Sequence, residues 1–185
     1  MPPAAGTFVQ DLFRRRGMDV YPGRRMAAAQ DGASLVSDRG ETAAADLVIA
    51  ATGVVPRHVP GDSGLSLDPQ GALKVDRHLQ SVSHPGVFGG GDGICFIDRP
   101  LPKVGVYAVR EGAVLAENLQ RNLQGRPLRT FEPQQRYLLI LNLGAGLGLL
   151  VCGGLVLRGR LPLLMKRWID RRFIRTHQRV SGERT

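Results

Sequence analysis

The sequence has little of what disulfide, nucleophile or metal chemistry needs. Its two cysteines, Cys95 and Cys152, lie far apart and form no C-x-x-C pair, which excludes a disulfide-stabilised scaffold and a dithiol redox motif. No G-x-S-x-G motif occurs and no base accompanies Cys95 in the sequence, so no catalytic side chain is predicted. No metal site is predicted either, because the histidines form no cluster with metal-ligand spacing; they stand at His58, His78, His84 and His177.

Aromatic residues are also scarce, at 5%, and no nucleic-acid recognition motif is present, so a nucleic-acid partner is not expected despite the net charge of +9. That charge is concentrated at the end of the chain, where residues 158–185 hold nine Lys and Arg against two acidic residues. The tail at 158–179 is open to two readings, a solvated helix face or a site for an anionic membrane surface. The scarce cysteines, and the lack of a basic, apolar leader in the given sequence, predict a cytoplasmic location with a peripheral membrane contact as the alternative.

Hydrophobic residues make up 43% of the chain, with 24 glycines and 12 prolines, which favours a loop-rich globular α/β protein over a disordered one. Residues 7–16 are expected to form a short helix that ends at Gly17, and residues 19–21 a short strand. A meander of three arms follows. Its first two arms lie at 26–30 and 34–37, and its turns are Asp31-Gly32 and Arg39-Gly40.

Two short apolar runs predict buried parallel strands. The first is 46–51, which ends in Thr52-Gly53, and the second is 87–88, which leads into the glycine cluster at 89–93. Pro56 and Pro60 mark a boundary between lobes. A long helix is expected at 105–123, stopped by Gly125. Its predicted apolar stripe consists of Val106, Val109, Ala113, Ala116 and Leu119.

The uncharged stretch 137–157 has about the length that a membrane span needs. Its glycines favour two strands joined by the turn Gly144-Ala145-Gly146, because glycine weakens a helix in water by roughly 1 kcal/mol. A single membrane span at 138–157 is the alternative. The residues that follow predict a basic amphipathic helix. Its apolar side chains are Leu161, Leu164, Met165, Trp168, Ile169 and Phe173.

Two polar residues stand where a ligand would be held. Asp92 lies in the glycine cluster, where a carboxylate can accept hydrogen bonds from sugar or ribityl hydroxyls; the alternative is a turn aspartate that caps its own backbone. Lys103 precedes the expected helix at 105–123, whose free N–H groups favour developing negative charge, such as that of a reduced flavin. The alternative for Lys103 is a surface charge.

Three segments taken together favour the ligand-binding interpretation of Asp92 and Lys103: ADLVIAATG at 45–53, VFGGGD at 87–92 and PKVGVYAVREG at 102–112. In this order and spacing they resemble the pyridine nucleotide–disulfide oxidoreductase family. Within it the chain is most similar to type II NADH dehydrogenase-like flavoproteins, especially a bacterial group found beside or fused to selenide, water dikinase. The resemblance runs from about Thr7 to about Thr176.

The resemblance implies a partial two-lobed FAD/NAD(P)-binding Rossmann-like fold with a C-terminal strand pair and an amphipathic helix. Residues 1–60 would be the C-terminal remnant of the NAD(P)H-binding lobe, 61–125 the C-terminal segment of the FAD-binding lobe, and 126–185 a C-terminal interface region. The implied activity is hydride transfer from NAD(P)H to the cofactor FAD, then to an acceptor such as a quinone. The implied cofactor-binding residues are Thr52, Gly53, Gly91, Asp92, Lys103, Gly105 and Val106.

The sequence departs from the family at two points. The family often has Cys directly after Gly-Asp, where this chain has Gly93 and, later, Cys95. The two G-x-G-x-x-G turns for FAD and NAD(P)H are absent, and GAGLGL at 144–149 has leucine at the last position. A truncated or split enzyme is therefore expected, with a separately encoded N-terminal half or a second copy as partner. A non-catalytic membrane- or partner-docking module is the alternative.

Overall fold

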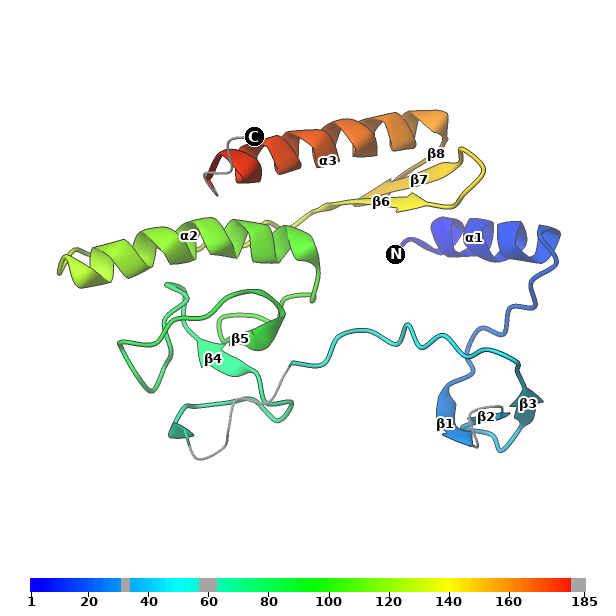
Figure 1. The fold of residues 1–185 in the computed structure, drawn as a ribbon, viewed down its shortest axis with the longest axis horizontal. Coiled ribbons are helices and arrows are strands. Elements are labelled where there is room, and N and C mark those ends of the chain that lie inside the picture. Colours follow the sequence, from blue (N-terminus) through cyan, green and yellow to red (C-terminus); the bar gives the residue numbers. More distant parts are fainter. Residues whose placement is uncertain (31–33, 57–62, 181–185) are drawn as a thin grey trace. The chain divides into compact units, whose positions relative to one another are not determined.

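The computed structural model describes residues 1–30, 34–56 and 63–180, and the chain folds as two compact units (Figure 1). The first unit contains Met1–Ile49 and Arg136–Thr185, and the second is Ala50–Gln135. The predicted turn Asp31-Gly32, the residues His58 and Pro60, and the predicted lobe boundary after residue 60 lie outside the described residues. The division into three segments stays a prediction.

A three-stranded antiparallel sheet with a helix on it forms the core of the first unit. The strands are β6 (Leu138–Asn142), β7 (Gly148–Cys152) and β8 (Leu155–Gly159), with β7 in the middle. The helix α1 (Pro3–Arg15) packs on this sheet through Ala5, Phe8 and Val9, against Leu149 and Val151 of β7. The apolar side chains of α1 and β7 therefore bury each other.

The end of α1 confirms the predicted stop at Gly17. Gly17 has φ +76°, and the N–H groups of Gly17 and Met18 donate to the carbonyls of Arg14 and Phe13, the two bonds of a glycine-terminated helix. The helix begins at Pro3, earlier than the predicted residue 7, because proline fits the first helical turn, where no N–H partner is needed.

The stretch 137–157 forms strands, as predicted, and the predicted turn Gly144-Ala145-Gly146 joins β6 to β7. Gly144 and Gly146 both have positive φ, which suits this tight turn. The sequence did not indicate the third strand, β8, which follows a second turn at Gly153. Among the residues that the structure describes, no helix is long and apolar enough to cross a membrane.

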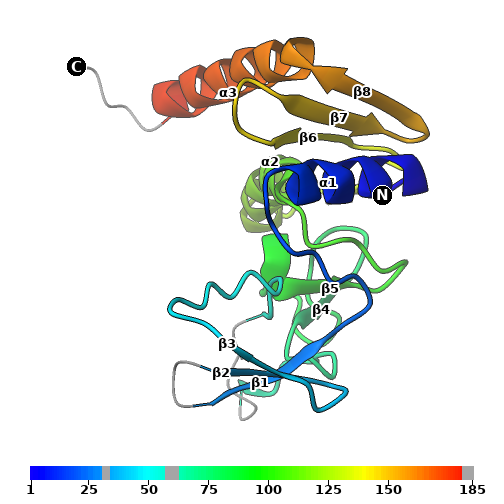
Figure 2. The same cartoon turned by 90° about the vertical axis from the view of Figure 1, so that its right-hand side faces the viewer.

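The basic amphipathic helix is confirmed as α3 (Arg160–Val180), which follows β8 and lies over the sheet (Figures 1 and 2). Its first turns pack: Pro162 is buried, and Leu163 lies so close to Gly148 that a Cβ there would be 2.9 Å from the Leu163 Cγ. The apolar side chains beyond these turns are exposed. They are Leu164, Met165, Trp168, Ile169, Phe173 and Ile174.

The predicted three-arm meander is confirmed. It consists of β1 (Met26–Gln30), β2 (Ser34–Ser37) and β3 (Thr42–Ala44), paired antiparallel in this order. The predicted strand at 19–21 is wrong, since these residues form no regular structure. The segment lies between two turns, at residues 16–17 and 22–23, and no described strand pairs with it.

The predicted buried strand at 46–51 is also wrong. These residues form no strand, and Leu47 and Ile49 are 76% and 81% exposed. A parallel strand exists only where neighbouring strands supply its hydrogen bonds, and no strand of the described residues lies beside this run. The apolar pattern therefore indicates burial that the described part of the chain does not provide.

The second unit has a parallel strand pair at its centre, β4 (Leu73–Val75) and β5 (Ile94–Phe96), joined by a connection that contains the short 3-10 helix η2 (Gly91–Gly93). The predicted strand at 87–88 is wrong: Phe88 makes a single bridge to Gln80. The strand of this region follows the glycine cluster instead of preceding it.

The long helix α2 (Gly105–Leu123) has the predicted bounds, but its buried face differs from the predicted stripe. Val109 and Leu119 are each 45% exposed. The buried residues are Tyr107, Glu111, Val114 and Asn118. Two of these are polar because they bind backbone groups: the Asn118 side chain, for example, donates to the carbonyls of His78 and Arg129 and accepts the Arg129 N–H. Satisfied in this way, a polar side chain is stable in a core.

Candidate functional site

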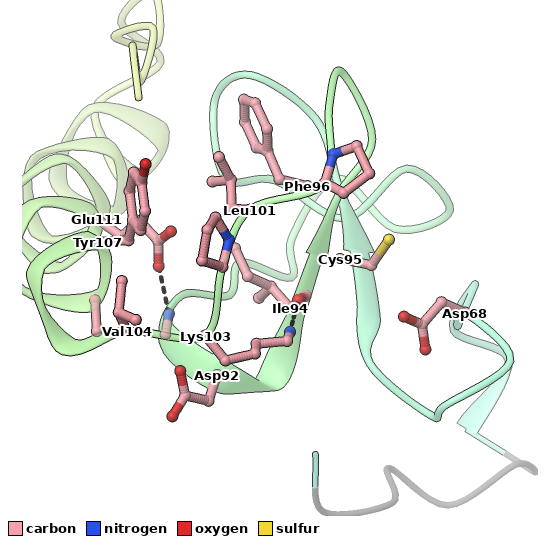
Figure 3. A pocket seen from close by; sticks show the side chains of 14 residues that line it. Asp68, Asp92, Ile94, Cys95, Phe96, Leu101, Lys103, Val104, Tyr107 and Glu111 are labelled. Atoms are coloured by element: carbon pink, nitrogen blue, oxygen red, sulfur yellow. Dashed lines mark hydrogen bonds between the residues drawn. The ribbon is translucent and has the colours of Figure 1, made fainter. Parts of the chain in front are cut away.

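A hollow of about 120 Å³ lies in the second unit, where η2, β5, the loop 100–104 and the start of α2 meet (Figure 3). It brings together three predicted site residues, Gly91, Asp92 and Lys103. The predicted residues Gly105 and Val106 do not line it, although their neighbours Val104 and Tyr107 do. The charged side chains that line it are Asp68, Asp92, Lys103 and Glu111. Ligand pockets usually enclose roughly 300–1,000 Å³, so this hollow by itself is too small to enclose a ligand of ordinary size.

The Asp92 carboxylate is available to a ligand. It accepts no hydrogen bond from the described part of the chain, and Figure 3 shows it apart from the Glu111 carboxyl group, which binds the Gly91 N–H instead. Two other turn aspartates behave differently: Asp68 accepts the N–H groups of Gln70 and Ala72, and Asp76 those of His78 and Gln80. Asp92 is therefore not the self-capping turn residue that was the alternative.

The glycines of the cluster at 89–93 are glycine for different structural reasons. A Cβ on Gly89 would be 2.8 Å from Ile94 Cγ2, so packing requires glycine there. Gly91 has φ +73°, a conformation that glycine adopts without strain. No atom lies within 4 Å of the Cβ position of Gly93 or of Gly105. Packing therefore does not require glycine at Gly93 or Gly105.

The first turn of α2 offers two backbone donors, directly after Lys103 and Val104 in the chain. The N–H groups of Gly105 and Val106 have no acceptor in the described part of the chain, as expected for the first positions of a helix. Their partial positive charge favours an anion or a carbonyl oxygen. The Lys103 ammonium group donates to the Ile94 carbonyl, which holds it over the same hollow. Lys103 is exposed, and this bond holds its ammonium group at the edge of the hollow.

Glu111 is a site residue that the sequence reasoning missed. Its side chain is 2% exposed, and its Oε2 accepts the Gly91 N–H at 2.6 Å. Burial raises the pKa of the Glu111 carboxyl group above its ordinary value, the Gly91 N–H and the Lys103 ammonium oppose the rise, and the Asp92 carboxylate adds to it. Its position four residues after Tyr107 and three before Val114, on the buried face, is the signal that would have found it.

The other predicted residues lie elsewhere. Thr52 and Gly53 are exposed, form no regular structure and do not line the hollow, although Gly53 has φ +103°. The half-buried thiol of Cys95 borders the hollow on the side of Asp68 (Figure 3). GAGLGL at 144–149 forms the turn between two strands, so it is not a phosphate-binding turn, which leads from a strand into a helix. Among the described residues, no group of three or more metal-ligating side chains could hold a metal ion.

A family model, pyridine nucleotide-disulphide oxidoreductase, matches residues 1–112, which is more than half of the chain. The matched residues include Thr52, Gly53 and the segment from Gly91 to Glu111.

Individual relatives agree with this model. The chain is 27% identical over 170 residues to a type II NADH:quinone oxidoreductase of Staphylococcus saprophyticus, covering 89% of the chain and 42% of that protein. It is 29% identical over 141 residues to ferroptosis suppressor protein 1 of Taeniopygia guttata, covering 71% and 37%. The crystal structure of a FAD-dependent pyridine nucleotide-disulphide oxidoreductase from Desulfovibrio vulgaris matches with a TM-score of 0.62 and 26% identity, covering 83% of the chain and 39% of that protein. The chain thus spans about two fifths of the length of these proteins.

Proposed function

Since the chain belongs to the pyridine nucleotide-disulphide oxidoreductase family, we propose that the hollow beside Asp92 holds the ribityl and pyrimidine end of FAD in an NAD(P)H-linked oxidoreductase. The observation that carries the proposal is the Asp92 carboxylate, which accepts no hydrogen bond from the described chain and belongs to a residue that lines the hollow together with Tyr107 and Ala108 of the start of α2. An acceptor at the hollow and two donors at the start of the adjoining helix match the hydroxyls of a ribityl chain and the carbonyl edge of a flavin.

The chain's own residues bind and orient in this proposal. Asp92 accepts from ribityl hydroxyls, and the N–H groups of Gly105 and Val106 donate to the pyrimidine edge. Lys103, fixed by the Ile94 carbonyl, adds positive charge there, which favours the reduced, negatively charged form. Bound FAD supplies the redox chemistry, which is hydride acceptance from NAD(P)H and electron delivery to an acceptor such as a quinone.

The remaining walls of the site come from a partner in this proposal. A hollow of about 120 Å³ cannot enclose a dinucleotide, and residues 1–185 contain no G-x-G-x-x-G turn for a diphosphate. The partner is a separately encoded N-terminal half or a second copy of the chain. The exposed apolar residues Leu47 and Ile49 support such a partner, because exposed apolar groups of this kind favour association.

Binding of three flavins to residues 1–185 tests the proposal. Because the hollow contacts the ribityl and ring portions, riboflavin, FMN and FAD are expected to bind with dissociation constants within about fivefold of one another, measured by quenching of flavin fluorescence. Absence of saturable riboflavin binding would contradict the site. Binding of FAD alone would show that the diphosphate, and not Asp92 with its neighbours, supplies the affinity.

A second function is carried by a different observation, the exposed apolar face of α3. We propose that α3 docks on an anionic membrane surface. Leu161 and Trp168 are each 63% exposed, and basic residues flank them on the same helix; the Arg172 guanidinium lies 5.7 Å from the centre of the Trp168 ring. An apolar stripe with an aromatic ring beside cations is typical of helices that lie in a lipid interface. The basic residues of α3 that would face the membrane surface are Lys166, Arg167, Arg171, Arg172 and Arg175.

Co-sedimentation with phosphatidylserine-containing vesicles tests this docking. Replacing Arg171 and Arg175 by glutamine is expected to weaken binding about 30-fold at low salt, from roughly 1 kcal/mol per basic residue near the surface. The matched control removes two exposed arginines elsewhere, Arg14 and Arg39, and is expected to change binding less than threefold. Equal binding to neutral and anionic vesicles would contradict the electrostatic part, and no binding would leave α3 a role in packing alone.

A further inference from the structure

The buried carboxyl group of Glu111 lies between the first turns of α2 and the turn that carries Asp92. Its Oε2 accepts the Gly91 N–H at 2.6 Å, and Gly91 is the residue immediately before Asp92. The backbone around this bond lies against α2: a Cβ built on Gly90 would be at ordinary contact distance, 3.5 Å, from the Glu111 Cβ and from Leu115 Cδ2, and one on Gly91 would be 3.7 Å from Ala108 Cβ. The turn therefore rests on the inner face of α2, and Glu111 supplies the hydrogen bond in that contact.

A carboxyl group is an unfavourable choice for stability alone at this place. Burial raises the pKa of Glu111, so the native state binds the proton more tightly than the unfolded state does. The favourable contribution is present below the ordinary glutamate pKa and is lost as the pH rises through the folded value. A glutamine would accept the same N–H without this loss. The ionised group, in return, makes a stronger, charge-assisted bond to Gly91.

We propose that Glu111 is a positioning residue of the flavin site: by holding the Gly91 N–H it fixes the turn Gly91–Gly93, so that the Asp92 carboxylate faces the hollow. The inference rests on the proposed function and adds to it a residue that does not touch the flavin. The charged groups facing Glu111 across the hollow are Asp92 on the turn, Lys103 on the loop before α2 and Asp68 on the far side.

A double-mutant cycle for flavin affinity tests this role. Because Glu111 acts through Asp92, Glu111→Ala is expected to lower riboflavin affinity at least tenfold, and Glu111→Ala combined with Asp92→Ala is expected to bind within about threefold of Asp92→Ala alone. Glu111→Gln, which keeps an acceptor for Gly91, is expected to stay within about threefold of the wild type. The control is Glu117→Ala, the other glutamate of α2, which pairs with Arg121 and Arg129 away from the hollow and is expected to leave affinity unchanged.

A ligand-free measurement keeps the inference testable if Glu111→Ala does not fold. The Gly91 amide resonance is expected to shift with pH with a midpoint above the ordinary glutamate range, and this titration is expected to vanish in Glu111→Gln. The role of Glu111 would be overturned if the affinity losses of Glu111→Ala and Asp92→Ala multiplied in the double variant, or if a folded Glu111→Ala kept wild-type affinity. A Gly91 amide resonance that does not shift with pH would overturn it too. Wild-type affinity of Asp92→Ala would instead overturn the flavin site itself.

Discussion

Replacing Asp92 by alanine is expected to lower flavin affinity roughly ten- to hundredfold, the effect of losing hydrogen bonds to a charged group worth about 1.5–3 kcal/mol. The free energy of unfolding is expected to stay within about 0.5 kcal/mol of the wild type, because the Asp92 side chain accepts no hydrogen bond from the described part of the chain. Flavin titration and urea denaturation of the same preparations measure the two quantities.

Two variants make the Asp92 result specific. Asp98→Ala removes an exposed carboxylate of the same unit, paired with Arg77 at 3.4 Å, and is expected to leave flavin affinity unchanged. Asp76→Ala removes the acceptor for the His78 and Gln80 N–H groups and is expected to lower stability by about 1–3 kcal/mol. Unchanged flavin affinity in Asp92→Ala would rule out the assignment of this residue to the ribityl chain.

Residues 1–185 alone are expected to show no measurable oxidation of NADH or NADPH with a quinone acceptor. Catalysis requires the nicotinamide and the flavin to be held face to face, and correct placement of two reactants accounts for roughly 7–11 kcal/mol of a barrier. The pyrophosphates of both are normally held by glycine turns at helix N-termini, and the 185 residues contain neither turn.

Absorbance at 340 nm measures the NAD(P)H oxidation, with the Staphylococcus saprophyticus type II NADH:quinone oxidoreductase as the active control. Size-exclusion chromatography of the same sample is expected to show association, since the apolar residues Leu47, Ile49 and Val55 are exposed. A yellow, monomeric preparation that turns over NADH would show that residues 1–185 are sufficient.

The sequence predicted those elements whose signals are local. The bounds of α2 follow from a glycine at each end, Gly105 and Gly125, and the end of α1 follows from Gly17. The turn at Gly144–Gly146 was predicted because repeated glycines disfavour a helix. These signals act within a few residues, so no knowledge of neighbours in space is needed.

The errors came from elements that depend on distant neighbours. The apolar run at 46–51 predicted a strand, but no described strand pairs with it. The stripe on α2 was assigned to Val109 and Leu119, whereas the buried face includes Glu111 and Asn118. A hydrophobicity pattern places polar residues outside and cannot indicate that a turn or loop packed on the helix supplies backbone partners for them.

The candidate site was predictable only where its residues carry a local sequence signal. Asp92, Lys103, Gly105 and Val106 were indicated by the glycine cluster, the helix start and the family resemblance. The structure brings Asp92 and Lys103 to one hollow, and Gly105 and Val106 stand at the start of the helix whose residues Tyr107 and Ala108 line it. Glu111 was missed because its role is defined by its contact with Gly91, twenty residues earlier.

The most direct test of the central claim is a titration of FAD into ¹⁵N-labelled residues 1–185 followed by amide resonances. The amide resonances of Gly93, Gly105 and Val106 are expected to shift saturably in the wild type, with the dissociation constant found by fluorescence. In Asp92→Ala the dissociation constant from the same shifts is expected to be at least tenfold higher. Shifts confined to residues 1–49 and 136–180, or a response of the α2 start that Asp92→Ala leaves unchanged, would contradict a flavin site at this hollow.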